Sequence, residues 1–354
     1  MHEQGSFAAS VLCSVARTLA AGVVARQTER DADGVSRYTS GGQDLVADTE
    51  VRFGYLAEAL ATDRPRLFTE QLAWLKVLCV ARDVDLNVIR LNVECMIAEV
   101  EERMHGDTAE RASAVLRAGI EHLDQAPTEI ESYLAADQPH IDLCRRFLLA
   151  VLETREQDAI ELILDAYERG VSIADLHEQV MHRVQLEVGR MWQMAEVTIA
   201  EEHYCTGIVT TITTLLRARV PRPEPNGRRV ITAMPGSETH DLGLRLVTQA
   251  FELDGWVAFH LGATTPASAI IEAARDFGCD AIALSTNIIL YLRQTADVIA
   301  QLRANPVTAE LPIIVGGQPF NLVDDLWKLI GADGCATSSM NAPQVVGDLL
   351  DSRA

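Results

Sequence analysis

The chain has 354 residues, of which 48% are hydrophobic and 23% charged, with a formal net charge of −21. This length exceeds what a single compact core usually holds, so we expect two or three domains, and the composition excludes a disordered or fibrous chain. The negative charge, without a dense run of Lys and Arg, argues against nucleic acid as a partner because phosphates would be repelled.

The first 130 residues have apolar side chains at three- and four-residue spacing, which is typical of amphipathic helices. We expect helices over residues 7–29, 51–61 and 67–81, with a polar, glycine-containing interruption at 31–43. The loose segment after Gln125 begins a join to the next domain. The sequence therefore predicts a helical N-terminal domain over residues 1–130.

Residues 131–220 are predicted to form a four-helix bundle, since four helical stretches follow one another with short joints. Gly170 is a typical left-handed stop for one helix, and Ser172 can cap the next. Thr198 and Glu201 have the spacing of a capping box, which places the start of the fourth helix. The expected helices cover 141–154, 157–169, 173–191 and 199–219.

Three prolines make residues 221–227 a linker, because proline removes backbone donors and fixes the chain. Beyond it, short β-branched apolar runs alternate with amphipathic helices, which predicts a flavodoxin-like, parallel, five-stranded Rossmann-type sheet over residues 228–354. Ligands of such sheets bind at the carboxyl ends of the strands. The expected strands are 229–234, 256–261, 281–285, 312–315 and 334–336.

The loop after the first expected strand contains Glu238, His240 and Gly243 in a Glu-x-His-x-x-Gly pattern. A neutral imidazole is a suitable cobalt ligand, and a carboxylate on its other ring nitrogen makes it more basic. Glycine leaves room for a bulky ligand beside the helix that follows. A βα loop with an incidental histidine is the alternative.

This string resembles the cobalamin-binding motif of methionine synthases, corrinoid carrier proteins and B12-dependent photoreceptors. Glu238 stands where many of these have Asp, as in the photoreceptor branch. The resemblance extends to a Ser/Thr-rich end of the third strand and a Gly-Gly after the fourth, which line the pocket for the nucleotide tail. It implies His240 as the lower axial ligand of cobalt and a set of cofactor-binding residues in this domain: Glu238, His240, Asp241, Leu242, Gly243, Ser285, Thr286, Gly316 and Gly317.

Trp192, followed after nine residues by Glu202 and His203, resembles the upper-face motif of adenosylcobalamin photoreceptors. The family uses the tryptophan to cover the adenosyl group and the acid to hold it, and Ile199 lies beside them in the sequence. A core tryptophan with a helix-start pair of glutamates is the alternative. Gln193 replaces the histidine that takes the vacant cobalt position after photolysis in the light-regulated repressors, so a second histidine ligand in the lit state is doubtful here.

The domain order, without a basic helix-turn-helix module, most resembles the photocobilins, which carry biliverdin beside cobalamin. A bilin needs a flat apolar slot and cations for its propionates. The N-terminal domain offers these residue types in Arg52, Tyr55, Arg66 and Trp74. A plain helical domain, with core aromatics and solvated arginines, is the alternative.

The resemblance implies a non-catalytic light sensor that binds adenosylcobalamin and changes conformation or oligomeric state in light, as a homo-oligomer signalling to an unidentified protein partner. A corrinoid carrier that shuttles methyl groups for methyltransferases is the alternative. A mutase subunit is disfavoured, because 354 residues leave no room for a barrel domain.

The cysteines are odd in number and far apart, and none forms a Cys-x-x-Cys pair, so we expect buried thiols of a reducing cytoplasm rather than disulfides or a zinc site. The N-terminus lacks a signal-peptide pattern, and no uninterrupted run of about eighteen apolar residues occurs. We expect a cytoplasmic protein with no membrane segment and no thioether link to a bilin. The seven cysteines are Cys13, Cys79, Cys95, Cys144, Cys205, Cys279 and Cys335.

Overall fold

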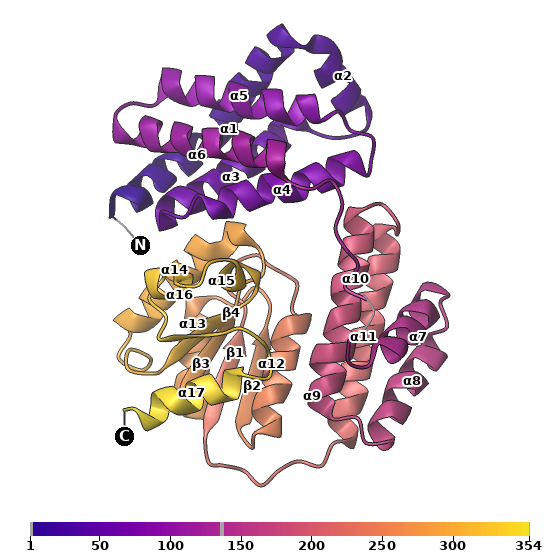
Figure 1. The fold of residues 1–354 in the computed structure, drawn as a ribbon. Coiled ribbons are helices and arrows are strands. Elements are labelled where there is room, and N and C mark those ends of the chain that lie inside the picture. Colours follow the sequence, from indigo (N-terminus) through magenta and orange to yellow (C-terminus); the bar gives the residue numbers. More distant parts are fainter. Residues whose placement is uncertain (1–2, 135–137, 354) are drawn as a thin grey trace. The chain divides into compact units, whose positions relative to one another are not determined.

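The computed structural model describes residues 3–134 and 138–353, so residues 1–2, 135–137 and 354 of the expected domains lie outside the described residues. The chain divides into two compact units (Figure 1). The first comprises Met1–Ile130 with Leu322–Leu329, and the second comprises Glu131–Asn321 with Ile330–Ala354. Each unit is described by itself below.

The first unit is helical, as the sequence predicts. Helix α1 packs against α3 and α5, and α4 packs against α6. The expected interruption at 31–43 is wrong in one respect, because α2 occupies most of it. Asp31 caps this helix by accepting a hydrogen bond from the Gly34 amide, and Gly42, with φ +88°, follows its end. The helices are α1 (Glu3–Arg30), α2 (Ala32–Ser40), α3 (Leu45–Thr62), α4 (Arg66–Val80), α5 (Leu86–Arg103) and α6 (Asp107–Gln125).

Within α1, residues Gly5–Arg30 are long and apolar enough to cross a membrane by length and composition, with a mean hydropathy of 1.8. A buried helix of a globular core meets the same criteria. Here Leu12, Leu19 and Val23 of α1 are buried within the unit. The composition of α1 therefore follows from its packing against α3 and α5.

The bundle has the four expected helical stretches, but the third is broken by a π-helical turn at Leu176–Met181. Gly170 has φ +96°, and the Ser172 hydroxyl accepts from the Asp175 amide, so both cap predictions are confirmed. The capping box of Thr198 and Glu201 is also present. The elements are α7 (Ile141–Leu152), α8 (Glu156–Glu168), α9 (Ile173–Asp175), α10 (His182–Gln193) and α11 (Ile199–Arg219).

The C-terminal domain is a five-stranded parallel sheet with the order β2-β1-β3-β4-β5, which confirms the flavodoxin-like prediction. Helices α12 and α17 pack against each other on one face of the sheet (Figure 1). Helices α13 and α14 also pack against each other, and α13 contacts β1. The direction of winding changes between β1 and β3, where such sheets bind ligands. The strands are β1 (Arg229–Ala233), β2 (Val257–Gly262), β3 (Ala281–Ser285), β4 (Ile313–Gly316) and β5 (Gly334–Ala336).

The helices of this domain follow the strands in alternation, as a doubly wound sheet requires. Short helical segments follow β3 and β4. In chain order the helices are α12 (Leu242–Leu253), α13 (Ala267–Phe277), the 3-10 turn Ile289–Tyr291, α14 (Leu292–Ala304), α15 (Gln318–Leu322), α16 (Leu326–Leu329) and α17 (Ala342–Asp351).

The bundle and the sheet domain make direct contacts within the second unit. Gln249 Nε2 donates to the carbonyl of Thr213 at 3.0 Å. The Ser339 hydroxyl, in the loop after β5, donates to Glu178 Oε1 at 2.6 Å. These hydrogen bonds tie α11 to α12 and the π-helical turn to the carboxyl-end loops of the sheet.

Candidate functional site

Glu238 and His240 lie in the loop between β1 and α12. The Glu238 side chain is completely buried, and its Oε2 accepts hydrogen bonds from the backbone amides of Asn287 at 2.8 Å and Ile288 at 3.3 Å. Its Oε1 lies 3.3 Å from Nδ1 of His240, whose side chain is 66% exposed. A fixed, buried carboxylate therefore faces one nitrogen of a solvent-facing imidazole.

The electrostatics of this pair favour a basic imidazole. The adjacent Glu238 carboxylate raises the pKa of His240, partial burial opposes the rise, and the charge of Glu202 adds to it. Because Nδ1 faces Glu238, Nε2 is the nitrogen left to bind a metal, and within residues 3–134 and 138–353 it has no hydrogen-bond partner.

The three residues after His240 have different roles. Asp241 accepts a hydrogen bond from Arg245 Nε at 3.0 Å, so its carboxylate stabilises the first turn of α12. Leu242 packs against the hydrophobic core of the bundle. Beside Gly243, a Cβ atom would meet no other atom within 4 Å, which leaves open space next to the histidine loop.

The loops after β3 and β4 meet each other, and the Thr286 amide donates to the Gly316 carbonyl at 3.0 Å. Ser285 and Thr286 are buried, and the Thr286 hydroxyl pairs with that of Thr295 at 2.7 Å. Gly316 ends β4. Gly317 has φ +115°, and a Cβ there would lie 2.0 Å from the carbonyl oxygen of Thr286, so only glycine fits. An exposed imidazole with a buried carboxylate, next to open space and small residues, fits the lower face and tail of a cobalamin.

The residues predicted for the upper face lie at the joint between α10 and α11. Trp192 is half-buried near the end of α10, and Ile199, the first residue of α11, is 51% exposed. Glu202 accepts from the Thr206 hydroxyl at 3.1 Å and lies 2.5 Å from Nδ1 of the exposed His203. Gln193 is buried, so its side chain lies in the bundle interior.

Two residues that support the site were not identified from the sequence. Asn287 uses its backbone amide to hold Glu238, and its side-chain amide donates to the His240 carbonyl at 3.2 Å. Arg190 binds Glu187 at 2.8 Å and Glu196 at 2.7 Å, which fixes the joint that follows Trp192. Asn287 directly follows Ser285 and Thr286, and this position is the only feature of the sequence that could have indicated its role.

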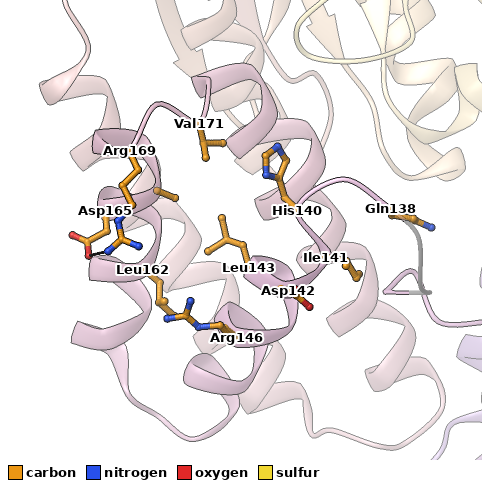
Figure 2. A pocket seen from close by; sticks show the side chains of 11 residues that line it. Gln138, His140, Ile141, Asp142, Leu143, Arg146, Leu162, Asp165, Arg169 and Val171 are labelled. Carbon is orange, nitrogen blue, oxygen red and sulfur yellow. Dashed lines mark hydrogen bonds and ion pairs between the residues drawn. The ribbon is translucent and has the colours of Figure 1, made fainter.

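A cavity of about 520 Å³ lies elsewhere, between α7 and α8 (Figure 2). Leu143, Leu162 and Val171 line it together with Arg146, and Arg169 at its edge pairs with Asp165. None of the residues predicted to bind cobalamin lines this cavity. Volume alone therefore does not locate the site that the motifs predict.

The four residues predicted to bind a bilin lie on α3 and α4 of the first unit. Arg52 is buried, and its guanidinium donates to Asn92 Oδ1 at 2.9 Å, so it belongs to a polar network between α3 and α5. Arg66 donates to the Leu322 carbonyl at 3.0 Å, Tyr55 is half-buried and Trp74 is 37% exposed. Their role in binding a ligand stays a prediction.

Two cysteine thiols of the first unit, Cys79 on α4 and Cys95 on α5, are buried. Burial raises the pKa of Cys79 to about 11, and it also raises the pKa of Cys95. Both thiols are therefore protonated at neutral pH and poor nucleophiles.

Two family models match the second unit. Residues 228–344 match the B12 binding domain, and residues 143–217 match a second B12 binding domain model. Together with the His240 loop and the parallel sheet, these matches define a cobalamin-binding protein. The bundle and the sheet domain therefore each match a B12-binding domain model.

Its relatives include both carriers and regulators. Over 195 residues the chain is 24% identical to dimethylamine corrinoid protein 3 of Methanosarcina acetivorans, which covers 54% of this chain and 90% of that protein. It is 25% identical to the HTH-type transcriptional repressor CarH of Myxococcus xanthus, over 51% of this chain and 59% of the repressor. The matched region thus spans less than two thirds of the repressor.

The solved structure of the Methanosarcina barkeri monomethylamine corrinoid protein has a similar fold. The TM-score is 0.52 at 19% sequence identity, with 59% of this chain and 99% of the other covered. At this identity the likeness shows the fold alone. The arrangement of helices before a parallel sheet is therefore common to this chain and the corrinoid protein.

Proposed function

We propose that this protein is a light sensor that holds adenosylcobalamin between the bundle and the sheet domain. The proposal rests on the joint between α10 and α11, which carries Trp192 and Glu202, and on the effect of the Glu202 charge on His240. Glu202 and His240 thus lie on the two domains that would face the two sides of a flat cofactor. The similarity to CarH supports the same function.

Four residues of the chain each have a separate role in this proposal. His240 would hold the cobalt through Nε2, with its ring directed by Glu238. Trp192 would cover the adenosyl group, and Glu202 would accept hydrogen bonds from its hydroxyls. Adenosylcobalamin supplies a cobalt–carbon bond that light breaks. Loss of the contacts to Trp192 and Glu202 then shifts the bundle to another conformation, which is a ligand-controlled change of population.

The experiment is to load the full chain with adenosylcobalamin and record its absorption spectrum before and after green light. We expect a spectral change in the wild type and faster loss of the adenosyl group in the dark from the Trp192→Ala variant. Phe7→Ala, which changes an exposed aromatic residue of α1 with no role in the proposal, is the matched control and should behave as the wild type. No spectral change in light, or equal retention by Trp192→Ala, contradicts the proposal.

A corrinoid methyl carrier is the second candidate function, because relatives include proteins named as dimethylamine and monomethylamine corrinoid proteins. The two functions make different demands on the upper face. A sensor needs contacts to the adenosyl group, whereas a carrier needs that face open to a methyl donor. Dissociation of adenosylcobalamin and methylcobalamin from wild type and Glu202→Gln distinguishes them: only a sensor retains the adenosyl form selectively and loses this selectivity in the variant.

We further propose biliverdin as a second chromophore of the helical N-terminal domain, which the exposure of Trp74 and the position of Arg66 on the same helix support. Protein produced with biliverdin should show a long-wavelength absorption band that weakens in Arg66→Ala. Without such a band the second chromophore is absent. The remaining parts of the proposal are a cytoplasmic location, a non-catalytic role, a light-dependent homo-oligomer and a protein partner.

A further inference from the structure

Residues 131–134, called the entry segment below, are the first residues of the second unit and follow the N-terminal stretch of the first unit. The amide of Tyr133 donates to Oε2 of Glu187 on α10 at 2.8 Å. The carbonyl of Leu134 accepts from Arg145 Nη2 on α7 at 3.1 Å, and the Leu134 side chain is buried in the core of the bundle. A stretch of chain that joins the two units is therefore fixed to α10 by a side-chain carboxylate.

The carboxylate of Glu187 has a partner on each of its oxygens. Oε2 accepts from the Tyr133 amide, whereas Oε1 accepts from Arg190 Nη2 at 2.8 Å and from Arg190 Nε at 3.0 Å. The side chains of Glu187 and Arg190 are 5% and 9% exposed. A buried carboxylate is stable as an anion only where a cation or several donors compensate for the loss of water. The strength of the bond to the Tyr133 amide therefore depends on Arg190.

Arg190 also binds the joint between α10 and α11, which follows Trp192. Its Nη2 donates to Oε2 of Glu196 at 2.7 Å, and its Nη1 donates to Oε1 of the same carboxylate at 3.0 Å. Two parallel hydrogen bonds of this kind fix the direction of a guanidinium as well as its position. Because one guanidinium serves both carboxylates, a displacement of Glu196 changes the geometry of the pairing between Arg190 and Glu187. The entry segment and the joint are thus connected by two ion pairs.

We propose that Glu187 and Arg190 couple the joint to the entry segment, so that the chain leading to the first unit loosens when Trp192 no longer holds an adenosyl group. The inference rests on the proposed function. While the joint is held, Arg190 keeps Glu187 ionised and directed at the Tyr133 amide. When the joint moves, Arg190 moves with it, and the bond to the amide weakens. Leu134 stays in the bundle core, so the segment is loosened at one point and not released.

The measurement is hydrogen exchange of the Tyr133 amide in the full chain, resolved by NMR, because this amide is the end of the network. Glu196→Gln neutralises the other end, where the side chain is 40% exposed. We expect the amide to exchange about tenfold faster in this variant than in wild type, with and without adenosylcobalamin in the dark. This factor corresponds to about 1.4 kcal/mol, as for a weakened hydrogen bond to a charged group. In wild type, adenosylcobalamin should slow the exchange, and green light should reverse this effect.

Two controls separate this coupling from a general loss of stability. Glu168→Gln removes an exposed carboxylate that pairs with Arg219 at 3.4 Å in the same bundle, and it should leave the exchange of the Tyr133 amide unchanged. The Asp175 amide, which donates to Ser172 Oγ at 3.0 Å, is the internal reference for opening of the bundle. Its exchange rate should be the same in wild type and in every variant.

A double-mutant cycle completes the test. In Glu187→Gln the amide should exchange fast, and adding Glu196→Gln should have no further effect, since both substitutions interrupt the same network. The proposal is overturned if Glu196→Gln leaves the Tyr133 amide at the wild-type rate, if the two substitutions act additively, or if light changes the cobalamin spectrum but not this rate. An unchanged spectrum contradicts the light sensor and its control of the entry segment, whereas the dark comparison still decides whether the network couples joint and segment.

Discussion

Nδ1 of His240 lies 3.3 Å from Oε1 of Glu238, and the two side chains differ completely in exposure, at 66% and 0%. The carboxylate is held by backbone amides of the loop after β3, so two loops of the sheet together set the direction of the imidazole. This arrangement fixes a ligand whose other nitrogen faces outward. The orientation and the pKa of His240 therefore depend on the negative charge of Glu238.

Glu238→Gln should weaken cobalamin binding by about 10- to 100-fold, the usual effect of changing a group that orients a metal-binding histidine. The amide keeps the volume but loses the charge that raises the pKa of His240. Spectrophotometric titration with cobalamin measures the effect. Glu272→Gln, at an exposed position of α13, is the control. Unchanged affinity in Glu238→Gln would show that the histidine is directed by something else.

Alanine at two glycines near the site should affect different properties, the stability of the fold at Gly317 and the affinity for cobalamin at Gly243. Gly317→Ala should lower the free energy of unfolding by at least about 2 kcal/mol, because of the positive φ and the close Thr286 carbonyl. Gly243→Ala has free space and should fold normally, yet bind cobalamin about tenfold more weakly if the cofactor fills that space. Urea unfolding and cobalamin titration separate the two effects. Full affinity in Gly243→Ala would place the cofactor elsewhere.

Arg190→Met should reduce the free energy of unfolding by about 3 kcal/mol, because it leaves the buried carboxylate of Glu187 unpaired. The Arg190 side chain is 9% exposed, and its hydrogen bonds, first that to Glu196 and then that to Glu187, raise its pKa. Denaturant unfolding measures the loss. Arg169→Met, whose ion pair is exposed, should cost less than about 1 kcal/mol. Equal effects in the two variants would argue against a bracing role.

Stability should fall as the pH falls below about 6.5, in part because of His177. Burial lowers the pKa of this histidine from 6.5 to about 4. Between these values the unfolded chain binds a proton that the folded chain does not, so acid favours unfolding. The full contribution is about 3 kcal/mol, lost as the pH falls from about 7 to below 4.

The measurement is the free energy of unfolding against pH for wild type, His177→Leu and the exposed-site control His105→Leu. The slope between pH 6.5 and about 4 should be smaller only in His177→Leu. Equal slopes in all three proteins would mean that His177 does not titrate in this window.

Much of the fold could be predicted because local patterns and tertiary structure agree. The expected strands 281–285 and 334–336 coincide with β3 and β5, since buried parallel strands are short apolar runs between polar turns. The capping box at Thr198 placed α11 correctly. Helix α2 was missed because its glycine and serine content is typical of a loop, although Asp31 caps it.

Part of the candidate site could likewise be predicted from the sequence, and part could not. The spacing of Glu238, His240 and Gly243 is a property of the sequence, and so is the resemblance that it carries. The sequence could not place the Asn287 amide against Glu238, because these residues are far apart in the chain and meet only where β1 and β3 pair. Nor could it predict the π-helical turn, in which buried His177 lies beside the Glu178 that binds Ser339.

The sequence by itself determined the order of helical and parallel-sheet segments and the histidine loop at a strand end, because hydrophobic periodicity and cap residues act locally. Only the tertiary structure decided which groups are buried together: Glu238 with the amides after β3, Arg190 with Glu187, and Gln249 with an acceptor left unsatisfied. Burial depends on contacts between distant segments. It places the Glu238 carboxylate against His240 and braces the α10–α11 joint through Arg190.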